Sequence, residues 1–247
     1  MSASLRLLDL GRRPYGEVLE LQRELCRRRI RGDEPDDLLL LVEHEPVITL
    51  GRGTRATSLP LAPAELERRG VPVVEVERGG DVTYHGPGQL VGYPILRLTE
   101  HREDLHWYLR SLEDVLILAL GRLQVEAERR PGLTGVWTAG RKIASIGIHV
   151  KQWVTFHGFA LNVCPDLSPF DLIVPCGIDN VVMTSVAQEL LRQDEEALWA
   201  DARRTAIEAF VDTFGYTSVA ADSRSGGTGT SEPVGALVQP TTAERGR

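Results

Sequence analysis

The chain has 247 residues, of which 42% are hydrophobic, so it can fill a core of its own as one large domain or two small ones. This excludes a miniprotein held by disulfides and a wholly disordered chain. The 28 basic residues are outnumbered by 35 acidic ones, and the net charge of −7 argues against a nucleic-acid binder, which needs a broad basic surface. Only two basic residues, Lys142 and Lys151, are lysines.

The cysteines and the N-terminal residues indicate the cellular compartment of the protein. Cys26, Cys164 and Cys176 are too few and too far apart for a disulfide framework, and no CxxC pair indicates a zinc site. Residues 1–10 lack the basic start and apolar run of a signal peptide, and no apolar stretch approaches the roughly 18 residues of a membrane span. We therefore expect a soluble, cytoplasmic protein that uses no metal or cofactor and binds neither nucleic acid nor membrane.

In the N-terminal half, hydrophobic periodicity predicts one amphipathic helix and three strands, and two glycine clusters bracket a loop before the third strand. In chain order these are the helix at 15–31, the strands at 37–42 and 71–76, the glycine clusters at 79–80 and 86–88, and the strand at 90–96. The run at 37–42 is almost continuously apolar, which is typical of a strand buried on both faces.

The C-terminal half predicts two long helices with an antiparallel meander between them. The elements are the helix at 101–123 with Asp104 as its cap, the strands at 135–138, 143–150 and 154–163, and the helix at 195–214. Strands mixed with flanking helices predict one α/β (α+β) domain over residues 1–218, built on a mixed sheet. Residues 219–247 are rich in Ser, Gly, Thr and Pro, and we expect a disordered tail there.

Common nucleotide and protease motifs are missing from the sequence. There is no GxxxxGK[ST] phosphate loop and no GxGxxG opening a helix after a strand. His44-Glu45 lacks the second histidine of HExxH, and the segment 144–147 lacks the first glycine of a GxSxG elbow. His101 and His106 fall on a predicted helix beside acidic residues, so we expect both to be solvated.

Residues 78–89, Arg-Gly-Gly-Asp-Val-Thr-Tyr-His-Gly-Pro-Gly-Gln, combine glycines with the polar-tipped side chains of Arg78, Tyr84, His85 and Gln89. Glycines permit backbone conformations and close approaches that other residues forbid, so such a loop can wrap around a ligand. The alternative is a plain glycine-rich connection between two strands. The density of polar side chains favours a binding loop.

Cys176 lies in the segment Val-Pro-Cys-Gly, outside any helical stripe. Pro175 restricts the approach of the chain and Gly177 leaves the far side of the sulfur open, which favours a thiol that a substrate can reach. Cys26 falls in the amphipathic helix, where a small buried hydrophobe is expected. Cys164 is ambiguous, and the residues alone favour Cys176 over the other two without excluding them.

Lys142 follows a tight turn at 139–141, and strand alternation places it on the same face as the even-numbered apolar residues of the strand at 143–150. A lysine on an apolar face is desolvated, which favours its neutral form and suits it to accept a proton. The alternative is a strand-end lysine whose ammonium reaches water. Lys151 falls on the opposite face, and we expect it to be solvated.

Taken together, the motifs resemble those of the lipoyl(octanoyl) transferase family. Each match is weak alone, but the set occurs in the family's order and spacing across about residues 37–178. The matching segments are 39–44 (LLLVEH) with Pro46, 50–52 (LGR), 78–89, 135–137 (GVW), 142–147 (KIASIG), 157–163 (HGFALNV), 166–170 (DLSPF) and 175–177 (PCG). The resemblance implies an α/β domain related to the catalytic domains of biotin and lipoate protein ligases.

The resemblance also implies an acyltransferase that begins protein lipoylation. Cys176 would take an octanoyl group from octanoyl-acyl carrier protein as a thioester and pass it to a lysine of a lipoyl domain, without ATP. Lys142 would act as a base for the thiol or as an ammonium beside the thiolate. The residues implied to line the acyl and pantetheine site are Arg78, Gly79, Gly80, Asp81, Val82, Thr83, Tyr84, His85, Ser145, Ile146, Gly147, Gly158, Phe159 and Ala160.

The implied partners are octanoyl-acyl carrier protein and the lipoyl domains of 2-oxoacid dehydrogenase complexes, together with the H protein of glycine cleavage. Carrier proteins are generally acidic. Residues 121–160 carry a net charge of about +4, so we expect a docking face there that includes Arg129, Arg130 and Arg141.

Two other functions remain open. One is an ATP-dependent lipoate or biotin protein ligase of the same fold, against which stand the Pro-Cys-Gly setting of Cys176 and the lack of a ligase-type lysine motif. The other is a non-catalytic protein that binds lipoyl domains.

Overall fold

A computed structural model describes residues 4–177 and 181–221 of the chain. Its elements, in chain order, are β1 (Ser4–Arg13), α1 (Tyr15–Arg31), β2 (Asp37–His44), β3 (Val47–Leu50), the 3₁₀ turn η1 (Ala56–Ser58), α2 (Pro63–Arg68), β4 (Val73–Glu75), β5 (Val82–His85), β6 (Gln89–Ile95), η2 (Leu98–Glu100), α3 (Leu105–Arg122), β7 (Glu128–Arg130), β8 (Leu133–Thr138), β9 (Arg141–Lys151), β10 (Val154–Asn162), η3 (Ser168–Leu172), η4 (Pro175–Gly177), α4 (Val186–Leu190), α5 (Glu195–Phe214) and β11 (Ser218–Ala221).

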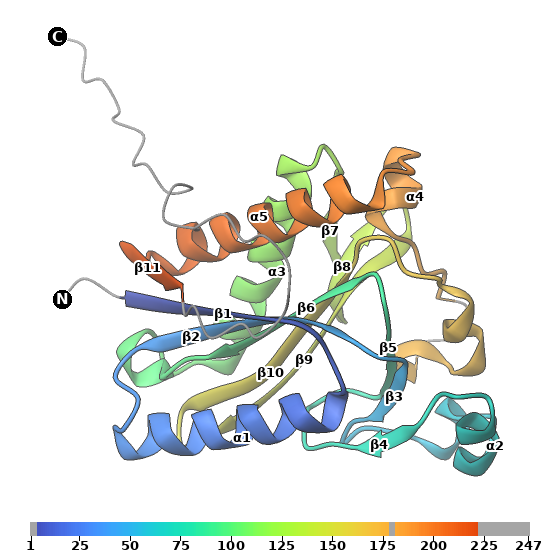
Figure 1. The fold of residues 1–247 in the computed structure, drawn as a ribbon, viewed down its shortest axis with the longest axis horizontal. Helices are drawn as coiled ribbons and strands as arrows, with labels where there is room; N and C mark the ends of the chain where they lie inside the picture. Colours follow the sequence, from blue (N-terminus) through green and yellow to red (C-terminus); the bar gives the residue numbers. More distant parts are fainter. Residues whose placement is uncertain (1–3, 178–180, 222–247) are drawn as a thin grey trace, which may run out of the picture.

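A large mixed sheet forms the centre of the molecule, with strand order β11-β1-β2-β6-β10-β9-β8-β7 (Figure 1). β1 runs parallel to β2 and β11, and the other neighbours in this sheet pair antiparallel. A small second sheet, β4-β3-β5, lies beside it near the start of α1. The predicted α/β class with a mixed sheet flanked by helices is confirmed.

Helices cover both faces of the large sheet, with α1 on one side and α3 and α5 on the other. β2 is buried on both faces, as predicted. Leu38 and Leu40 pack in the cluster under α1, whereas Leu39 and Leu41 pack in the cluster under α3 and α5. Each such leucine contributes about 2 kcal/mol by leaving water, so this strand anchors both halves of the core.

Local sequence signals position the long elements. α1 has the predicted bounds, and α3 starts after Asp104, whose side chain accepts a hydrogen bond from the Trp107 N–H at 3.0 Å. β8, β9 and β10 form the predicted antiparallel meander. The segment 78–89 is not a continuous loop, because its middle forms β5 and pairs antiparallel with β3.

The end of the domain differs slightly from the predicted boundary. β11 pairs in parallel with β1 over Ser218–Ala221, so three residues assigned to the tail belong to the large sheet. The rest of the predicted tail, 222–247, lies outside the described residues. Among the described residues, no helix is both long and apolar enough to cross a bilayer.

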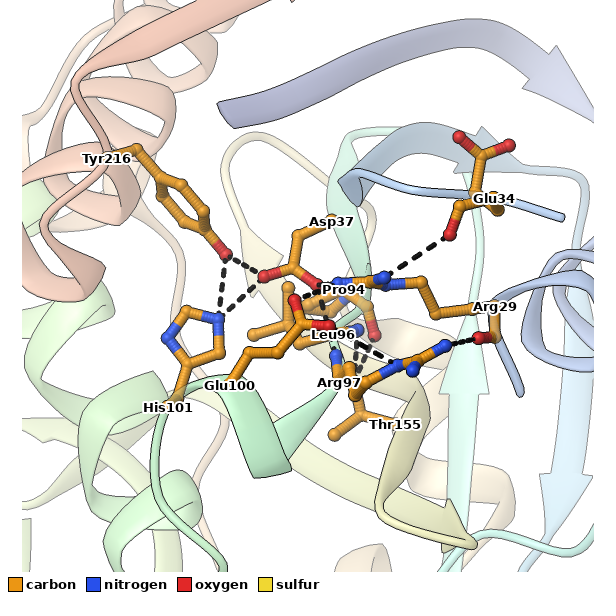
Figure 2. A network of polar contacts seen from close by, with 10 residues as sticks. All are labelled: Arg29, Glu34, Asp37, Pro94, Leu96, Arg97, Glu100, His101, Thr155 and Tyr216. Carbon is orange, nitrogen blue, oxygen red and sulfur yellow. Dashed lines mark hydrogen bonds and ion pairs between the residues drawn. The ribbon is translucent and has the colours of Figure 1, made fainter. Parts of the chain in front are cut away.

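A buried polar network around Asp37 joins the start of β2 to α1, to the turn after β6 and to the chain after α5 (Figure 2). One carboxylate oxygen of Asp37 accepts from the Arg97 N–H at 3.0 Å and contacts Arg29 at 3.1 Å. The other lies 2.6 Å from His101 Nε2 and accepts from the Tyr216 hydroxyl at 2.9 Å.

The network corrects one expectation. His101 precedes α3, and only 9% of its side chain is exposed, because Asp37 and Tyr216 enclose it. Periodicity could not place it, since its partners are distant in sequence. His106, on α3, is exposed as predicted.

Candidate active site

A cavity of about 210 Å³ opens on the α1 side of the large sheet, with the segment 78–85 as its opposite wall. Twelve of the fourteen residues expected to bind substrate line it, and Cys176 lies on its border. The twelve are Arg78, Gly80, Asp81, Val82, Thr83, His85, Ser145, Ile146, Gly147, Gly158, Phe159 and Ala160. The side chains of Ile146 and Phe159 pack in the core on the other face of the sheet, so their backbone borders the cavity.

Two expected residues lie apart from the cavity. Tyr84 points the other way from its neighbours in β5, and its ring packs edge-on against Phe170. Gly79 does not line the cavity, and its N–H donates to the Ile148 carbonyl at 2.8 Å. Their assignment to the substrate site has no support from the geometry.

Several lining residues escaped the sequence analysis, chiefly Tyr15, Val91, Tyr93, Thr134 and His157. They come from α1, β6, β8 and β10, and only the sheet topology brings these elements together. Tyr15 begins α1 and faces the core at 5% exposure, a position that helical periodicity alone cannot distinguish from packing.

Lys142 and Cys176 meet at one side of this cavity, although 34 residues separate them in sequence. The Lys142 ammonium donates to Cys176 Sγ at 3.1 Å and to the Thr134 carbonyl at 3.1 Å. Lys142 is only 1% exposed, whereas Cys176 is half-buried. A buried cation next to a reachable thiol stabilises the thiolate, the nucleophilic form of cysteine.

A bulge in β9 produces this contact. Val136 of β8 pairs with Ala144, and the next residue, Trp137, pairs with Lys142, so β9 has one extra residue here. Because neighbours in a strand point to opposite faces, Lys142 faces away from the side of Ala144. The prediction from strand alternation that Lys142 and Ala144 lie on the same face is therefore wrong. The Lys142 Nζ instead lies 5.4 Å from the centre of the Trp137 ring.

Cys176 sits in the tight turn η4 with a left-handed backbone, at φ 58° and ψ 17°. Gly177 is also left-handed, and a Cβ there would lie 2.3 Å from Asp81 Oδ2. Asp81 is held in turn by the Ser58 hydroxyl at 2.7 Å and by the Val82 N–H at 2.7 Å. The Asp81 carboxylate and its partners thus seat the nucleophile turn against the cavity wall.

Arg78 braces this wall from inside. Its guanidinium donates to the Asp81 carbonyl at 2.7 Å and to the carbonyl and hydroxyl of Thr49, both at 2.8 Å. Burial lowers the pKa of Arg78, and its Nε, also buried, has no hydrogen-bond partner among the described residues. The arginine therefore places a positive charge at the cavity wall.

Aromatic rings form one part of the cavity wall, which we call the aromatic floor. Tyr15 stacks on His85 with ring centres 5.8 Å apart, and His44 lies behind them, 2.8 Å from the Tyr93 hydroxyl. His44 Nδ1 lies 3.0 Å from the Arg13 carbonyl, which can only accept, so Nε2 accepts from Tyr93. Burial lowers the pKa of His44 to about 4 and that of His85 well below its usual value. Both rings are neutral at pH 7.

Comparison with known proteins identifies the family of this chain. A model of the lipoyl protein ligase A/B catalytic domain matches residues 14–211. An octanoyltransferase of Nostoc sp. (strain PCC 7120) is 48% identical over 213 residues, which cover 86% of this chain and 93% of that protein. An octanoyltransferase of Gloeobacter violaceus is 54% identical over 176 residues, covering 71% of this chain and 77% of that protein. The chain belongs to the octanoyltransferase family.

Members of the octanoyltransferase family are acyltransferases of lipoate biosynthesis, so the resemblance noted in the sequence is confirmed. The fold is also shared with proteins of much lower sequence identity. A bipartite lipoate protein ligase of Thermoplasma acidophilum superposes with a TM-score of 0.66 at 14% identity, covering 91% of this chain and 88% of that one. A lipoate-protein ligase A bound with ATP gives 0.67, covering 91% and 90%. At such identities the likeness concerns the fold alone.

The other two cysteines of this octanoyltransferase are poorer nucleophiles. Burial raises the pKa of Cys26 to about 11, and Cys26 packs on the buried face of α1 as predicted. Burial likewise raises the pKa of Cys164 to about 11, helped by the charges of Glu195 and Glu43. Both thiols are protonated at pH 7. Among the described residues, no cluster of His, Cys, Asp and Glu could hold a metal ion.

Proposed function

We propose that this octanoyltransferase moves an octanoyl group from octanoyl-acyl carrier protein to a lysine of a lipoyl domain, with Cys176 as the nucleophile and Lys142 as its partner. The observation that carries the proposal is the 3.1 Å contact between Lys142 Nζ and Cys176 Sγ on the border of the cavity. We also infer that the protein works in the cytoplasm, which stays a prediction from the sequence.

In the first step the Cys176 thiolate attacks the thioester carbonyl of the carrier-bound octanoyl group. The C–S bond to pantetheine breaks, the pantetheine thiol leaves with a proton, and octanoyl-Cys176 remains. One thioester replaces another, so the step is nearly balanced in free energy and needs no ATP. The ammonium of Lys142 stabilises the thiolate before attack and can supply the proton to the leaving thiol.

In the second step the amine of a lipoyl-domain lysine attacks octanoyl-Cys176. An amide bond forms, the Cys176 thiolate leaves, and neutral Lys142 takes the proton that the amine loses. An amide is more stable than a thioester, which drives the transfer. The Gly177 N–H is not free to hold the oxyanion, because it donates to the Val174 carbonyl at 3.0 Å.

The cavity suits an acyl chain that enters at Cys176 and ends at the aromatic floor. Val82, Val91 and Ala160 line it, and Tyr15 and Tyr93 close it. Burying six methylene groups there would contribute roughly 5 kcal/mol. We propose that this floor limits the length of the acyl chain.

For the carrier protein, the structure weakens the predicted docking face over 121–160. Arg129 pairs with Glu113 and Asp114, and Arg141 makes two hydrogen bonds to Glu189 at 2.7 and 2.9 Å. These partners compensate the two charges, whereas Arg130 lies over the Trp137 ring. Charges paired in this way leave little net field to attract an acidic protein.

Two other arginines are better placed to meet an acidic partner. Arg52 and Arg55 are exposed and have no ion pair among the described residues. The loop that carries them lies against the cavity wall, since the Arg52 and Gly53 N–H groups donate to the carbonyls of Arg78 and Gly80. We therefore propose that the carrier protein docks over Arg52 and Arg55.

A transfer assay separates this function from that of a ligase. Octanoyl-acyl carrier protein and an apo lipoyl domain should give the octanoylated domain without ATP, whereas free octanoate with ATP should give neither octanoyl-AMP nor product. Formation of octanoyl-AMP would contradict the proposal and favour a ligase. Binding of the lipoyl domain without any transfer would instead favour a non-catalytic binding protein.

A further inference from the structure

One peptide group connects the Lys142 ammonium to a buried carboxylate on α3. The carbonyl of Thr134 accepts from Lys142 Nζ at 3.1 Å, and the N–H of the same peptide, that of Gly135, donates to Glu113 Oε1 at 3.2 Å. Hydrogen bonds in such a chain polarise one another, so a carboxylate at one end strengthens the acceptor that faces the ammonium at the other.

Glu113 is held firmly enough to act as a support. It is 1% exposed, and its second oxygen accepts from Arg110 at 2.6 Å and from Arg129 Nε at 2.9 Å. Arg129 also donates to the Arg110 carbonyl at 3.0 Å. The two arginines compensate the buried charge and leave Oε1 directed at the Gly135 N–H.

Gly135 keeps the space between this support and Lys142 open. Its φ is +123°, and a Cβ would lie 2.7 Å from the Ala144 carbonyl and 2.9 Å from Lys142 Cε. A larger residue would thus press on the lysine side chain. The backbone at 134–135 is fixed by Glu113 on one side and contacts Lys142 on the other.

We infer that Glu113 is a positioning residue, which holds the Thr134–Gly135 peptide so that Lys142 Nζ stays in contact with Cys176. The inference rests on the proposed roles of Lys142 and Cys176. Glu113 itself touches no reacting atom and supplies no proton. Glu113 acts on Cys176 only indirectly, through the Thr134–Gly135 peptide and Lys142.

The test is a double-mutant cycle on the reactivity of Cys176, measured as the pH dependence of its alkylation by iodoacetamide. Lys142→Ala should move the midpoint of alkylation to higher pH. Glu113→Ala should move it in the same direction, with alkylation at pH 7 slowed about three- to tenfold, and the double variant should match Lys142→Ala alone. Glu113→Gln keeps an oxygen for the Gly135 N–H and should stay close to the wild-type profile.

The matched control is Asp114→Asn, the neighbouring acid on α3, which pairs with Arg129 and is half exposed. It should leave the profile unchanged. An additive double variant, or a Glu113→Ala profile equal to wild type in folded protein, would overturn the inference. So would a Glu113→Gln profile as altered as that of Glu113→Ala. Should Glu113→Ala fail to fold, Glu113→Asp, which keeps the charge for the two arginines but is one methylene shorter towards the Gly135 N–H, takes its place in the cycle.

The alkylation readout needs no acyl donor, which keeps the two proposals separable. If Lys142→Ala leaves the profile of Cys176 unchanged, the pairing of these residues fails and the proposed mechanism with it. If Lys142→Ala shifts the profile but Glu113→Ala does not, only the role of Glu113 fails.

Discussion

Lys142 combines two properties that an arginine could not supply at this position. Its ammonium is compact enough to lie between a thiol and a backbone carbonyl, and an amine can release its proton. A guanidinium does not deprotonate in proteins. In a chain that otherwise uses arginine almost throughout, the contact of Lys142 with Cys176 gives a physical reason for an amine. Lys151, the other lysine, is exposed as predicted.

Replacement of Lys142 by alanine should weaken the nucleophile without removing it. The thiolate of Cys176 loses its neighbouring cation, so the pH profile of its alkylation should move to higher pH, and the rate at pH 7 should fall about tenfold. Stopped-flow alkylation across pH 5 to 10 measures this, with Lys151→Ala as the control. An unchanged midpoint would remove Lys142 from the mechanism.

The three cysteines should differ sharply in reactivity. Cys176→Ser should abolish octanoyl transfer, whereas Cys26→Ala should retain most of it, because Cys26 is a packing residue with a raised pKa. Removing a buried sulfur costs some stability, so circular dichroism should accompany the assay. Loss of transfer in Cys26→Ala with retention in Cys176→Ser would reverse the assignment.

At the scale of elements, the sequence was a good guide to α1, α3, α5 and the meander because periodicity and caps are local signals. It was a poor guide to β5, whose four residues lie between glycines and pair with β3, and to β1 and β11, which pair with each other. It did not predict the bulge in β9 either. A bulge is an extra residue relative to the partner strand, so it cannot be recognised from one strand's sequence before the pairing is known.

The loop that follows β3 leads to a prediction about the carrier protein. The double variant Arg52→Glu/Arg55→Glu should raise the KM for octanoyl-acyl carrier protein roughly tenfold at low salt, and less at 0.5 M salt. It should leave the KM for a small octanoyl thioester unchanged. Steady-state kinetics with both donors measures the difference.

Arg141→Glu is the matched control, since Arg141 already pairs with Glu189 in the predicted docking face. If Arg141→Glu raised the KM for octanoyl-acyl carrier protein more than the double variant does, the result would favour carrier docking over residues 121–160.

For the whole molecule, the site depends on contacts between segments that are far apart in sequence. Cys176, Lys142 and Arg78 come from three separate stretches, and the sheet order brings them together. The sequence motifs identified most of these residues. Neither the distances between their side chains nor the aromatic floor of the cavity could be predicted from the sequence. The Asp37 network, which links α1, β2 and the chain after α5, is part of what holds these segments in register (Figure 2).

Loss of the Asp37 charge should therefore destabilise the fold. Burial alone would raise the pKa of Asp37, but hydrogen bonds from His101 and the Arg97 N–H hold it below its usual value. A carboxylate with a lowered pKa stabilises the folded state above its unfolded value of about 3.9, and this contribution disappears as pH falls through the folded value.

Asp37→Asn should cost about 3 kcal/mol at pH 7, which lowers the melting temperature by roughly 6–12 °C, and the difference from wild type should shrink below about pH 4. Thermal and urea unfolding at pH 7 and at several pH values between 2 and 4 check both parts. Asp33→Asn, an exposed acid in the same region, should have little effect. A difference that grows towards low pH would contradict the network's role.

The most direct test of the account is the intact mass of the protein after brief mixing with octanoyl-acyl carrier protein and no acceptor. We predict a single octanoyl adduct that hydroxylamine removes, that peptide mapping places on Cys176, and that disappears when an apo lipoyl domain is added. No adduct, or an adduct on Cys26 or Cys164 with Cys176 unmodified, would contradict the account.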